Sequence, residues 1–432
     1  MKFSTTTLGC KVNIYETEAL IADLIEKGWV YTEVDSDIDV YIINTCTVTS
    51  TSDQKSRQMI RQARRKYENA IIVAMGCFTQ THPETSVELA DIVLGTNDRL
   101  KIYDFVNSYL ETKKQINHIF DINNFTKYDE MKLEKLTQHT RGFVKIQDGC
   151  ENFCSYCLIP YARGPIKSRD SKSIIHEINE LIRQGTKEIV ISGINTGTYG
   201  QDLGNINLAK LIELIMTKTK LAQLRLSSIE LMEVSDELLN VIKKYENRIA
   251  NHLHIPLQGG SDSVLARMKR KYNTSEYEKL INKIRSIFPD IAITTDYIAG
   301  FVGETDDEFK EAYNFIEKIN FSSMHVFPYS RRKGTIADGM SGHLNPIVIK
   351  GRAKKIIELA KKMKINYNNQ FIDRDVNVLL EQRKGDYMVG HTSNYLEVHI
   401  PYQNNLVENE FVNVKIIEST NDILLGKIIK ED

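Results

Sequence analysis

The sequence predicts an α/β protein with three folded parts: an N-terminal doubly wound parallel sheet, a central partial (β/α) barrel and a small C-terminal antiparallel β-barrel. Two patterns carry this prediction. Strand-like apolar runs alternate with helical segments up to about residue 370, as in βαβ units. Only strand-like segments follow that point. We place the parts at residues 1–118, 139–370 and 371–432, with a polar linker at 119–138.

The composition is that of an ordinary globular protein. The 432 residues carry a net charge of −1, with 41% hydrophobic and 26% charged residues, which excludes a disordered or fibrous chain. No apolar run approaches the length of a membrane span, and the N-terminus lacks the apolar core of a signal peptide. We therefore expect a cytoplasmic protein without a membrane partner.

Three dispersed cysteines follow strands of the N-terminal part. We expect strands at 3–8, 39–44, 70–75 and 92–94, with helices at 14–27 (capped by Asn13), 53–67 and 98–110. Cys10, Cys46 and Cys77 each come just after one of the first three strands. Because the carboxyl ends of parallel strands border one crevice, these thiols can converge on a metal cluster. The alternative is three unrelated buried thiols.

A second, tight group of cysteines opens the central part. We expect strands at 143–147, 188–192, 223–227, 252–257, 292–297 and 323–327, and helices at 171–184, 208–219, 235–244, 261–270, 275–287 and 305–318. Cys150, Cys154 and Cys157 lie in the loop after the first strand, where a β/α barrel places its chemistry. Three thiolates without a nearby His suit a [4Fe–4S] cluster with one open iron. A structural zinc site, which needs four ligands, is the alternative.

Several loops after the central strands offer glycines and polar groups to a ligand. An adenosine-type ligand with an amino-acid tail would suit a cluster with an open iron, although each loop alone is equally an ordinary turn. His252 and His254 alternate on one strand and are interpreted as a packed or hydrogen-bonded pair. The candidate cofactor contacts are Tyr156, Gly193, Asn195, Ser228, Glu230, Gln258, Asp296 and Gly300.

A basic helix leads into the C-terminal strands. The helix expected at 347–369 carries seven Lys and Arg residues against Glu358 alone. Strands expected at 376–382, 387–391, 396–400, 411–418 and 423–429 form a five-stranded barrel, a shape common among nucleic-acid-binding domains. The helix is therefore interpreted as an RNA or DNA contact, with a solvated surface face as the alternative.

Taken together, these features resemble the radical S-adenosylmethionine (SAM) methylthiotransferases over essentially the whole chain. The tight cysteines match the family's CxxxCxxC motif, and the C-terminal barrel is similar to its RNA-binding TRAM domain. The subgroup acting on isopentenyladenosine typically has Gly-Cys-Gln-Met-Asn at the first cysteine. The subgroup acting on N6-threonylcarbamoyladenosine in tRNA is more similar here, through Thr7-Leu8-Gly9-Cys10-Lys11-Val12-Asn13, Lys145-Ile146-Gln147-Asp148-Gly149-Cys150 and Ile159-Pro160-Tyr161-Ala162-Arg163-Gly164-Pro165.

The resemblance implies a definite chemistry. Cys150, Cys154 and Cys157 would hold the radical cluster, which binds and cleaves SAM. Cys10, Cys46 and Cys77 would hold a second [4Fe–4S] cluster that presents sulfur. The product would be a 2-methylthio adenosine at position 37, in the anticodon loop of tRNA. A reductant protein such as a flavodoxin or ferredoxin is implied, while the sulfur donor is not identified.

Other functions remain open from the sequence. Isopentenyladenosine tRNA or an aspartate of a ribosomal protein would change only the substrate. A non-catalytic RNA-binding protein with zinc would need a fourth ligand at each site. A simple iron–sulfur electron carrier usually closes its clusters with four cysteines and needs no barrel for a cofactor.

Overall fold

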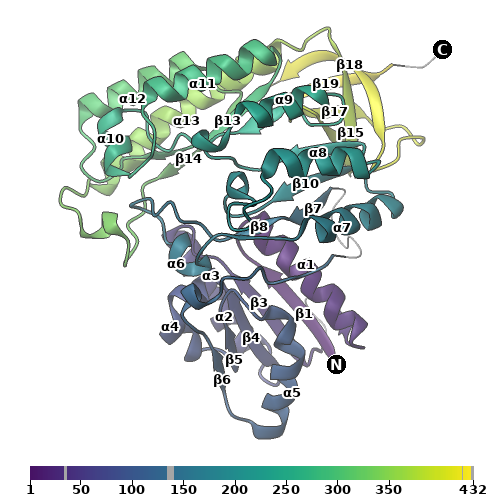
Figure 1. Cartoon of the computed structure of the whole chain (residues 1–432), viewed down its shortest axis with the longest axis vertical. Helices are drawn as coiled ribbons and strands as arrows, with labels where there is room; N and C mark the ends of the chain where they lie inside the picture. The colour runs from purple at the N-terminus through teal and green to yellow at the C-terminus, as the bar shows by residue number, and fades with distance from the viewer. Residues whose placement is uncertain (34–36, 134–140, 421, 430–432) are drawn as a thin grey trace.

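The computed structural model describes residues 1–33, 37–133, 141–420 and 422–429. The N-terminal sheet domain lies at one end of the molecule, with the central part stacked on it and the C-terminal barrel beside the central part (Figure 1). Parallel sheets in the first two parts and a closed five-stranded barrel in the third confirm the predicted fold class. No helix in these described ranges is both long and apolar enough to cross a membrane.

Six parallel strands form the N-terminal sheet, in the order β2-β1-β3-β4-β5-β6. The central strands β3 and β4 are buried along their whole length, because helices cover both faces of the sheet. The edge strands β2 and β6 have only two and three residues and are not evident in the sequence pattern. The strands are β1 (Lys2–Thr7), β2 (Val30–Tyr31), β3 (Val40–Thr45), β4 (Ile71–Gly76), β5 (Ile92–Leu94) and β6 (Ile116–His118).

Helices pack on opposite faces of this sheet. Side chains of α1 and α5 share one core with β1, while α2 packs in a second core with β3. The predicted cap at Asn13 is wrong: Cys10 is the N-cap, and Asn13 lies inside the helix, where its Nδ2 donates to the Leu8 and Thr45 carbonyls at 2.8 and 3.1 Å. The helices are α1 (Lys11–Glu26), α2 (Ser50–Lys66), α3 (Cys77–Thr81), α4 (Pro83–Val87), η1 (Arg99–Lys101) and α5 (Ile102–Thr112).

Part of the expected linker is folded. Met131 and Leu133 are buried in the core shared by α1 and β1, and the Tyr15 hydroxyl donates to the Met131 carbonyl at 2.7 Å. The helical turn η2 (Ile122–Asn124) packs against Gly164 of the central part. Residues 134–138 of the expected linker lie outside the described ranges.

The central part is a partial barrel of six parallel strands. β7 (Gly142–Lys145), β10 (Glu188–Ser192) and β11 (Gln223–Leu226) form one sheet, and β12 (His252–His254), β13 (Ala292–Ala299) and β14 (Ser323–Pro328) the other. Two parallel bridges, Leu224 to Ile249 and Ser228 to His254, join β11 to the β12 segment. The remaining elements are β8 (Gln147–Asp148), α6 (Ile159–Arg163), β9 (Lys167–Ser168), α7 (Ser171–Arg183), η3 (Thr196–Thr198), α8 (Leu208–Lys218), η4 (Leu231–Glu233), α9 (Asp236–Lys244), α10 (Asp262–Arg267), α11 (Thr274–Ile287), α12 (Asp306–Ile319) and η5 (Ile336–Gly339).

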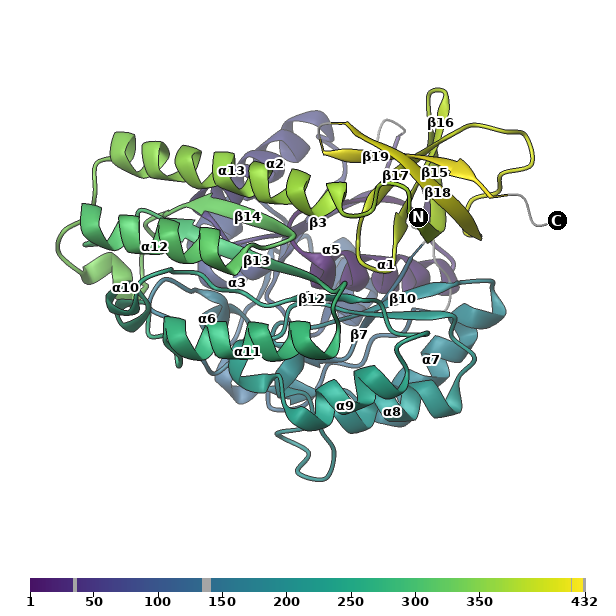
Figure 2. The same cartoon turned by 90° about the horizontal axis from the view of Figure 1, so that it is seen from above.

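The basic helix α13 (Pro346–Asn369) runs along β14 to the C-terminal barrel (Figure 2). Several of its cations are already engaged. Arg352 is buried and donates to Glu304 and Asp306 at 2.8 and 2.6 Å. Lys354 and Lys362 lie 4.0 and 3.8 Å from glutamates. Arg352 is thus a packing residue, whereas Lys350, Lys354, Lys355, Lys361 and Lys362 are exposed, and the predicted role of the helix as a nucleic-acid contact stays a prediction.

The C-terminal barrel is closed, in the order β15-β16-β17-β19-β18. It is fastened to the central part by Arg225, which donates to the Thr392 and Ser393 carbonyls at 3.1 and 2.9 Å and lies over the Tyr395 ring. The strands are β15 (Asp375–Lys384), β16 (Tyr387–Thr392), β17 (Glu397–Pro401), β18 (Phe411–Thr420) and β19 (Ile423–Ile428).

Candidate active site

The dispersed cysteines lie together at the carboxyl edge of the N-terminal sheet. Cys10, Cys46 and Cys77 follow β1, β3 and β4, which are neighbours in the sheet. Their loops are in contact, since a Cβ atom on Gly9 would lie 3.0 Å from the Cys46 Sγ. The convergence expected from the strand ends is therefore present in the structure.

The tight cysteines lie in the loop after β8. The Cys150 N–H donates to the Gly164 carbonyl at 3.1 Å, and the Cys157 N–H to the Cys154 carbonyl at 3.0 Å. Ser155 is buried between them and bonds to the backbone of α10 through the Arg267 carbonyl at 2.8 Å. The loop is thus held by backbone bonds that leave its thiols free for ligation.

A glycine with positive φ precedes three of the six cysteines. Gly9, Gly76 and Gly149 have φ angles of +113°, +107° and +78°, a region that favours glycine. At Gly149 a Cβ atom would lie 1.8 Å from the Pro165 carbonyl oxygen. These turns aim the following thiol out of its strand, and any other residue at Gly149 would displace Cys150.

Burial makes the free thiols poor anions. It raises the pKa of Cys77 to about 11, although Arg163 opposes this shift, and it also raises the pKa of Cys46. In the tight group burial raises the pKa of Cys150 to about 11 and that of Cys157 to about 12. Thiolates at neutral pH would therefore require a bound metal centre to hold them.

N–H donors surround the sulfur atoms in both groups. Arg163 Nε lies 3.2 Å from the Cys77 Sγ, and Arg270 Nη1 lies 3.4 Å from the Cys154 Sγ. Backbone N–H groups of Val48 and Ile159 point at Cys46 and Cys157 at 3.5 and 3.4 Å. Hydrogen bonds of this kind are a usual means of tuning iron–sulfur clusters. Each group also has one arginine at a sulfur.

Neither group is spaced for a single ion. Among the described residues, no three His, Cys, Asp or Glu side chains are arranged to hold one metal ion. In a cubane cluster each thiolate binds a different iron, so the ligands stand farther apart than around one zinc. The donor set of three cysteines per group fits [4Fe–4S] clusters better than zinc.

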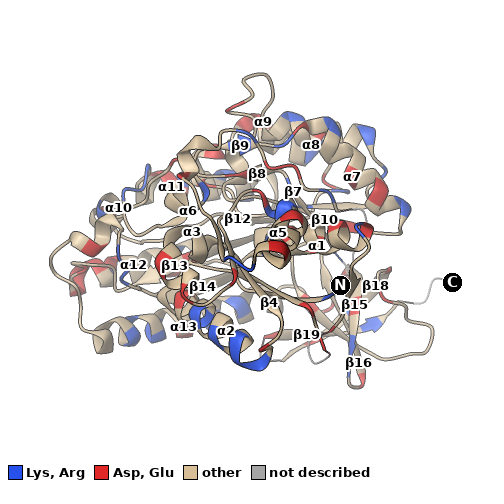
Figure 3. Ribbon diagram, turned by 90° about the horizontal axis from the view of Figure 1, so that it is seen from below, with Lys and Arg blue, Asp and Glu red and all other residues tan. Residues whose placement is uncertain are grey.

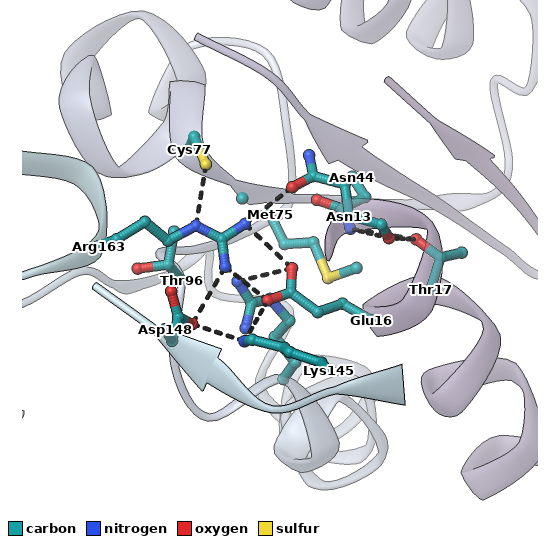
Figure 4. A network of polar contacts seen from close by, with 12 residues as sticks. Asn13, Glu16, Thr17, Asn44, Met75, Cys77, Thr96, Lys145, Asp148 and Arg163 are labelled. Atoms are coloured by element: carbon teal, nitrogen blue, oxygen red, sulfur yellow. Dashed lines mark hydrogen bonds and ion pairs between the residues drawn. The ribbon is translucent and has the colours of Figure 1, made fainter. Parts of the chain in front are cut away.

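A buried ionic network surrounds Arg163 beside Cys77 (Figure 4). Glu16 of α1 is fully buried and binds Arg163 Nη1 at 2.5 Å and Lys145 Nζ at 2.7 Å. Lys145 also contacts Asp148 at 2.5 Å, and Asp148 Oδ1 accepts the Gly149 N–H at 2.8 Å. Arg163 thus contacts Cys77 through Nε. It also contacts Asp148, which accepts a hydrogen bond from Gly149 in the loop of Cys150.

The charges of this network are fixed at neutral pH. Burial alone would raise the pKa of Glu16, but Arg163, Arg99 and Lys145 outweigh it and lower the pKa to about 2. Burial opposes ionisation of Asp148 as well, yet Lys145 and Arg163 hold its pKa below the usual range. The network remains charged wherever the protein is folded near neutrality.

Comparisons with known proteins place these features in a family. Residues 144–316 match the Radical SAM superfamily, and residues 2–95 match the uncharacterized protein family UPF0004. A Bacillus subtilis protein named threonylcarbamoyladenosine tRNA methylthiotransferase MtaB is 40% identical over 421 residues, covering 96% of this chain and 93% of that protein. The chain belongs to the radical SAM tRNA methylthiotransferase family. The family resemblance seen in the sequence is thereby confirmed.

Other relatives show the breadth of the family. A Thermoanaerobacter pseudethanolicus protein named tRNA-2-methylthio-N(6)-dimethylallyladenosine synthase is 33% identical, covering 98% of this chain and 92% of that protein. Among solved structures, the radical SAM methyltransferase TsrM from Kitasatospora setae superposes with a TM-score of 0.57 over 76% of both chains, at 14% identity. That likeness concerns the fold alone.

As a radical SAM tRNA methylthiotransferase, the protein is an enzyme of a superfamily that uses SAM and a [4Fe–4S] cluster. The barrel mouth offers polar atoms without partners that fit such a ligand. Asn195 Nδ2 donates to Glu233 Oε1 at 2.8 Å. The other oxygens of these two side chains, Asn195 Oδ1 and Glu233 Oε2, are buried without a hydrogen bond among the described residues, as is Ser227 Oγ.

Glu230 lies beside the tight cysteines. It is ion-paired to both terminal nitrogens of Arg270, with 3.1 Å from Nη1 to Oε1, and Arg270 also contacts Cys154. Burial raises the pKa of the neighbouring Glu233 to about 7. In this enzyme Glu230 is therefore already partnered, while Glu233 and Asn195 keep free acceptors.

The remaining candidate cofactor contacts are distributed around the barrel. Gly193 packs against the Gln147 side chain, and Gly300, at φ +72°, packs against Ile349 of α13. Gln258 has φ +63°, and its N–H donates to the Asp296 carbonyl at 2.8 Å. Three further candidates lie elsewhere: Tyr156 is edge-on to Phe301, and Ser228 and Asp296 line a cavity beside the barrel. For all of these residues, contact with a cofactor stays a prediction.

Sequence reasoning missed Arg163, Arg270 and Glu233. Arg163 stands in a motif that carries the family resemblance, but its contact with Cys77, 86 residues away, has no local signal. Arg270 and Glu233 are ordinary charged residues that no local pattern identifies. The predicted interpretation of His252 and His254 agrees with the structure, where both rings bond to Thr294 Oγ1 at 2.8 and 2.9 Å.

Proposed function

We propose that this enzyme methylthiolates C2 of N6-threonylcarbamoyladenosine at position 37 of tRNA and uses two [4Fe–4S] clusters. The observation that carries the proposal is the pair of separate three-cysteine groups joined through Arg163 and its acidic partners. Three thiolates leave one iron of a cubane open. If each group holds such a cluster, one open iron would be available to SAM and the other to the sulfur.

The substrate assignment is supported by the names of relatives and by the residues at the first cysteine. The threonylcarbamoyladenosine relative is 40% identical and the dimethylallyladenosine relative 33%. Lys11 stands where the isopentenyladenosine subgroup typically has Gln. A positive side chain beside the sulfur-presenting group suits an anionic substituent better than a hydrocarbon.

The cofactors supply one-electron cleavage of SAM, removal of the C2 hydrogen, and transfer of sulfur and a methyl group. The chain's own residues position the reactants. Cys150, Cys154 and Cys157 would ligate one cluster, and Cys10, Cys46 and Cys77 the other. Arg270 holds Cys154 and Glu230 together, while Asn195 and Glu233 offer acceptors to the amino and hydroxyl groups of SAM.

The proposal includes a location and a reductant. We expect the enzyme to work in the cytoplasm and to take electrons from a protein such as a flavodoxin or ferredoxin. The sulfur donor is not identified by any residue.

Anaerobic reconstitution tests the two-cluster part. We expect about eight irons in the wild type and about four in each of two triple variants, Cys150→Ala/Cys154→Ala/Cys157→Ala and Cys10→Ala/Cys46→Ala/Cys77→Ala. Stoichiometric zinc in a colourless protein would contradict the proposal and favour the non-catalytic metalloprotein. About four irons in the wild type and none in the first variant would remove the second cluster.

Mass spectrometry of nucleosides tests the substrate. The reconstituted enzyme is incubated with SAM, reductant and tRNA bearing threonylcarbamoyladenosine or isopentenyladenosine at position 37. We expect the 2-methylthio product only from the first. Product from the isopentenyl tRNA alone would replace the proposed substrate and leave the enzyme class intact.

A further inference from the structure

A cavity of about 460 Å³ lies where the three parts of the chain meet. Its walls come from the start of α1, the strands β11 to β14, α13 and the C-terminal barrel. This volume lies in the range of small-ligand sites. Lys11, next to Cys10, lines one side, while Ser228 and Asp296, both candidate SAM contacts, line another.

Two lysines bring unpaired positive charge to this cavity. The ammonium groups of Lys11 and Lys364 have no acceptor among the described residues. By contrast, Arg225 in the same wall already has partners. It forms an ion pair with Glu188 Oε1 at 2.7 Å and donates hydrogen bonds to carbonyls of the C-terminal barrel. The charge available to a ligand therefore comes from the two lysines.

The acids of the cavity wall are already partnered. Asp296 Oδ2 lies 3.3 Å from His254 Nε2. Glu397 Oε1 lies 2.7 Å from His399 Nε2. Both carboxylates thus bond to neighbouring imidazoles, and neither forms an ion pair with Lys11 or Lys364 among the described residues, so the two ammonium groups remain available to an anionic ligand.

An independent observation concerns His252 in the same wall. Its side chain is buried, with 7% exposed, and its ring stacks on Tyr395 with centroids 5.2 Å apart. Nε2 shares a hydrogen bond with Thr294 Oγ1 at 2.8 Å, but Nδ1 has no partner among the described residues. A buried polar atom without a partner in a cavity wall is a place where a ligand can complete the hydrogen bonding.

We propose that this cavity binds the N6 substituent of the substrate adenosine, with Lys11 and Lys364 binding its terminal carboxylate. The inference rests on the proposed function and deepens it. A threonylcarbamoyl group carries one carboxylate and one hydroxyl, whereas an isopentenyl group carries neither. Ammonium–carboxylate hydrogen bonds would satisfy the lysines. The hydroxyl would satisfy His252 Nδ1.

The position of the cavity is consistent with this role. Lys11 is joined directly to Cys10 of the proposed sulfur-presenting group, and Ser228 and Asp296, both candidate SAM contacts, line the same cavity. A substituent held here would keep its adenine between the two proposed clusters. The lysines would thus act in substrate specificity rather than in the chemical step.

Binding of short RNAs to the full-length, cluster-loaded protein tests the proposal. The probes are anticodon stem-loops that carry adenosine, isopentenyladenosine or threonylcarbamoyladenosine at position 37, measured by fluorescence anisotropy at one salt concentration. We expect the wild type to bind the threonylcarbamoyl RNA about tenfold more tightly than the adenosine RNA, the scale of a charged hydrogen bond. Lys11→Gln and Lys364→Gln should each lose most of that preference.

Matched variants separate charge in the cavity from charge in general. Lys11→Arg should keep the preference, because the charge remains. Lys354→Gln should also keep it, since Lys354 lies on α13 with 79% of its side chain exposed and outside the cavity lining. Iron content is measured for every variant, so that a loss of cluster is not mistaken for a loss of recognition.

The outcomes distinguish this inference from the proposed function. If threonylcarbamoyl tRNA is methylthiolated but the Lys11→Gln and Lys364→Gln proteins keep the wild-type preference, the inference is overturned and the function stands. A wild type without preference for the threonylcarbamoyl RNA also overturns the inference. If only isopentenyl tRNA gives product, the proposed substrate fails and the inference fails with it.

Discussion

Arg163 and Arg270 occupy equivalent positions in the two cysteine groups. Each arginine is neutralised by a glutamate, Glu16 or Glu230, and each directs one N–H at a cysteine sulfur. A hydrogen bond to a ligand sulfur stabilises the reduced, more negative cluster and so raises its reduction potential. The two arginines therefore provide separate control of the two proposed clusters.

Replacing each arginine by lysine tests this control at the level of single residues. We expect Arg163→Lys to lower the potential of the cluster at Cys10, Cys46 and Cys77 by about 50 mV, roughly 1 kcal/mol for a one-electron couple, because one N–H bond to sulfur is lost. Arg270→Lys should shift the other cluster alone. The measurement is a redox titration followed by electron paramagnetic resonance. Equal shifts of both clusters in either variant would contradict separate control.

At the scale of elements, the sequence predicts a helix or strand best where residues within that element form its cap and its apolar face. Helix α12 matches its predicted start closely, because Thr305 and Glu308 form a capping box. The edge strands β2 and β6 are set by pairing with distant strands and leave no local pattern. Asn13 has the chemistry of a cap, yet the turn at Gly9 starts the helix earlier, and tertiary contacts use Asn13 instead.

The basic helices also show that a local sequence pattern cannot predict contacts with distant residues. Sequence composition points to α13, but its cations are partly used in packing. Figure 3 shows Lys and Arg along α2 as well, where Arg61 and Arg65 are exposed and have no acceptor among the described residues. Which basic helix remains available to RNA depends on partners from distant parts of the chain.

We therefore expect α2 to contribute more to tRNA binding than the paired lysines of α13. The variant Arg61→Ala/Arg65→Ala should weaken binding by about tenfold and reduce the slope of log K against log salt by about two, because two phosphate contacts are lost. Lys354→Ala/Lys362→Ala is the matched control and should leave the slope nearly unchanged. Filter binding at several salt concentrations measures both. The reverse order of effects would assign the RNA surface to α13.

At the scale of the whole molecule, ionic contacts hold the parts together around the candidate site. Strand order and cysteine spacing predict where the six thiols lie, because the carboxyl ends of parallel strands share an edge. The contacts between parts are not predictable in this way. Glu16 and Lys145 are 129 residues apart, and Arg225 meets Thr392 across 167. Long-range pairing of buried charges has no signature in a local window of sequence.

A second contact between the N-terminal and central parts makes stability depend on pH. The carboxylate of Glu177 in α7 binds Arg169 at 2.6 Å and lies 3.2 Å from the Tyr15 hydroxyl of α1. Burial raises the pKa of Glu177 to about 7, although Arg169 opposes the shift. A carboxyl whose folded pKa exceeds its unfolded value favours the folded state below that unfolded value and loses this contribution as pH rises through 7.

The free energy of unfolding should therefore fall as pH is raised from 5.5 to 8. We expect a decrease of about 1–3 kcal/mol from Glu177, measured by anaerobic urea unfolding of the loaded protein. Glu177→Gln should reduce but not abolish this dependence, because the amide stays neutral at every pH while Glu18 and Glu233, whose pKa values burial also raises to about 7, still titrate. Glu16→Gln is the control: it should destabilise the protein but keep the slope, since the pKa of Glu16 is about 2 and its charge is constant in this range. A wild type and a Glu177→Gln protein with the same slope would show that another group titrates at this interface.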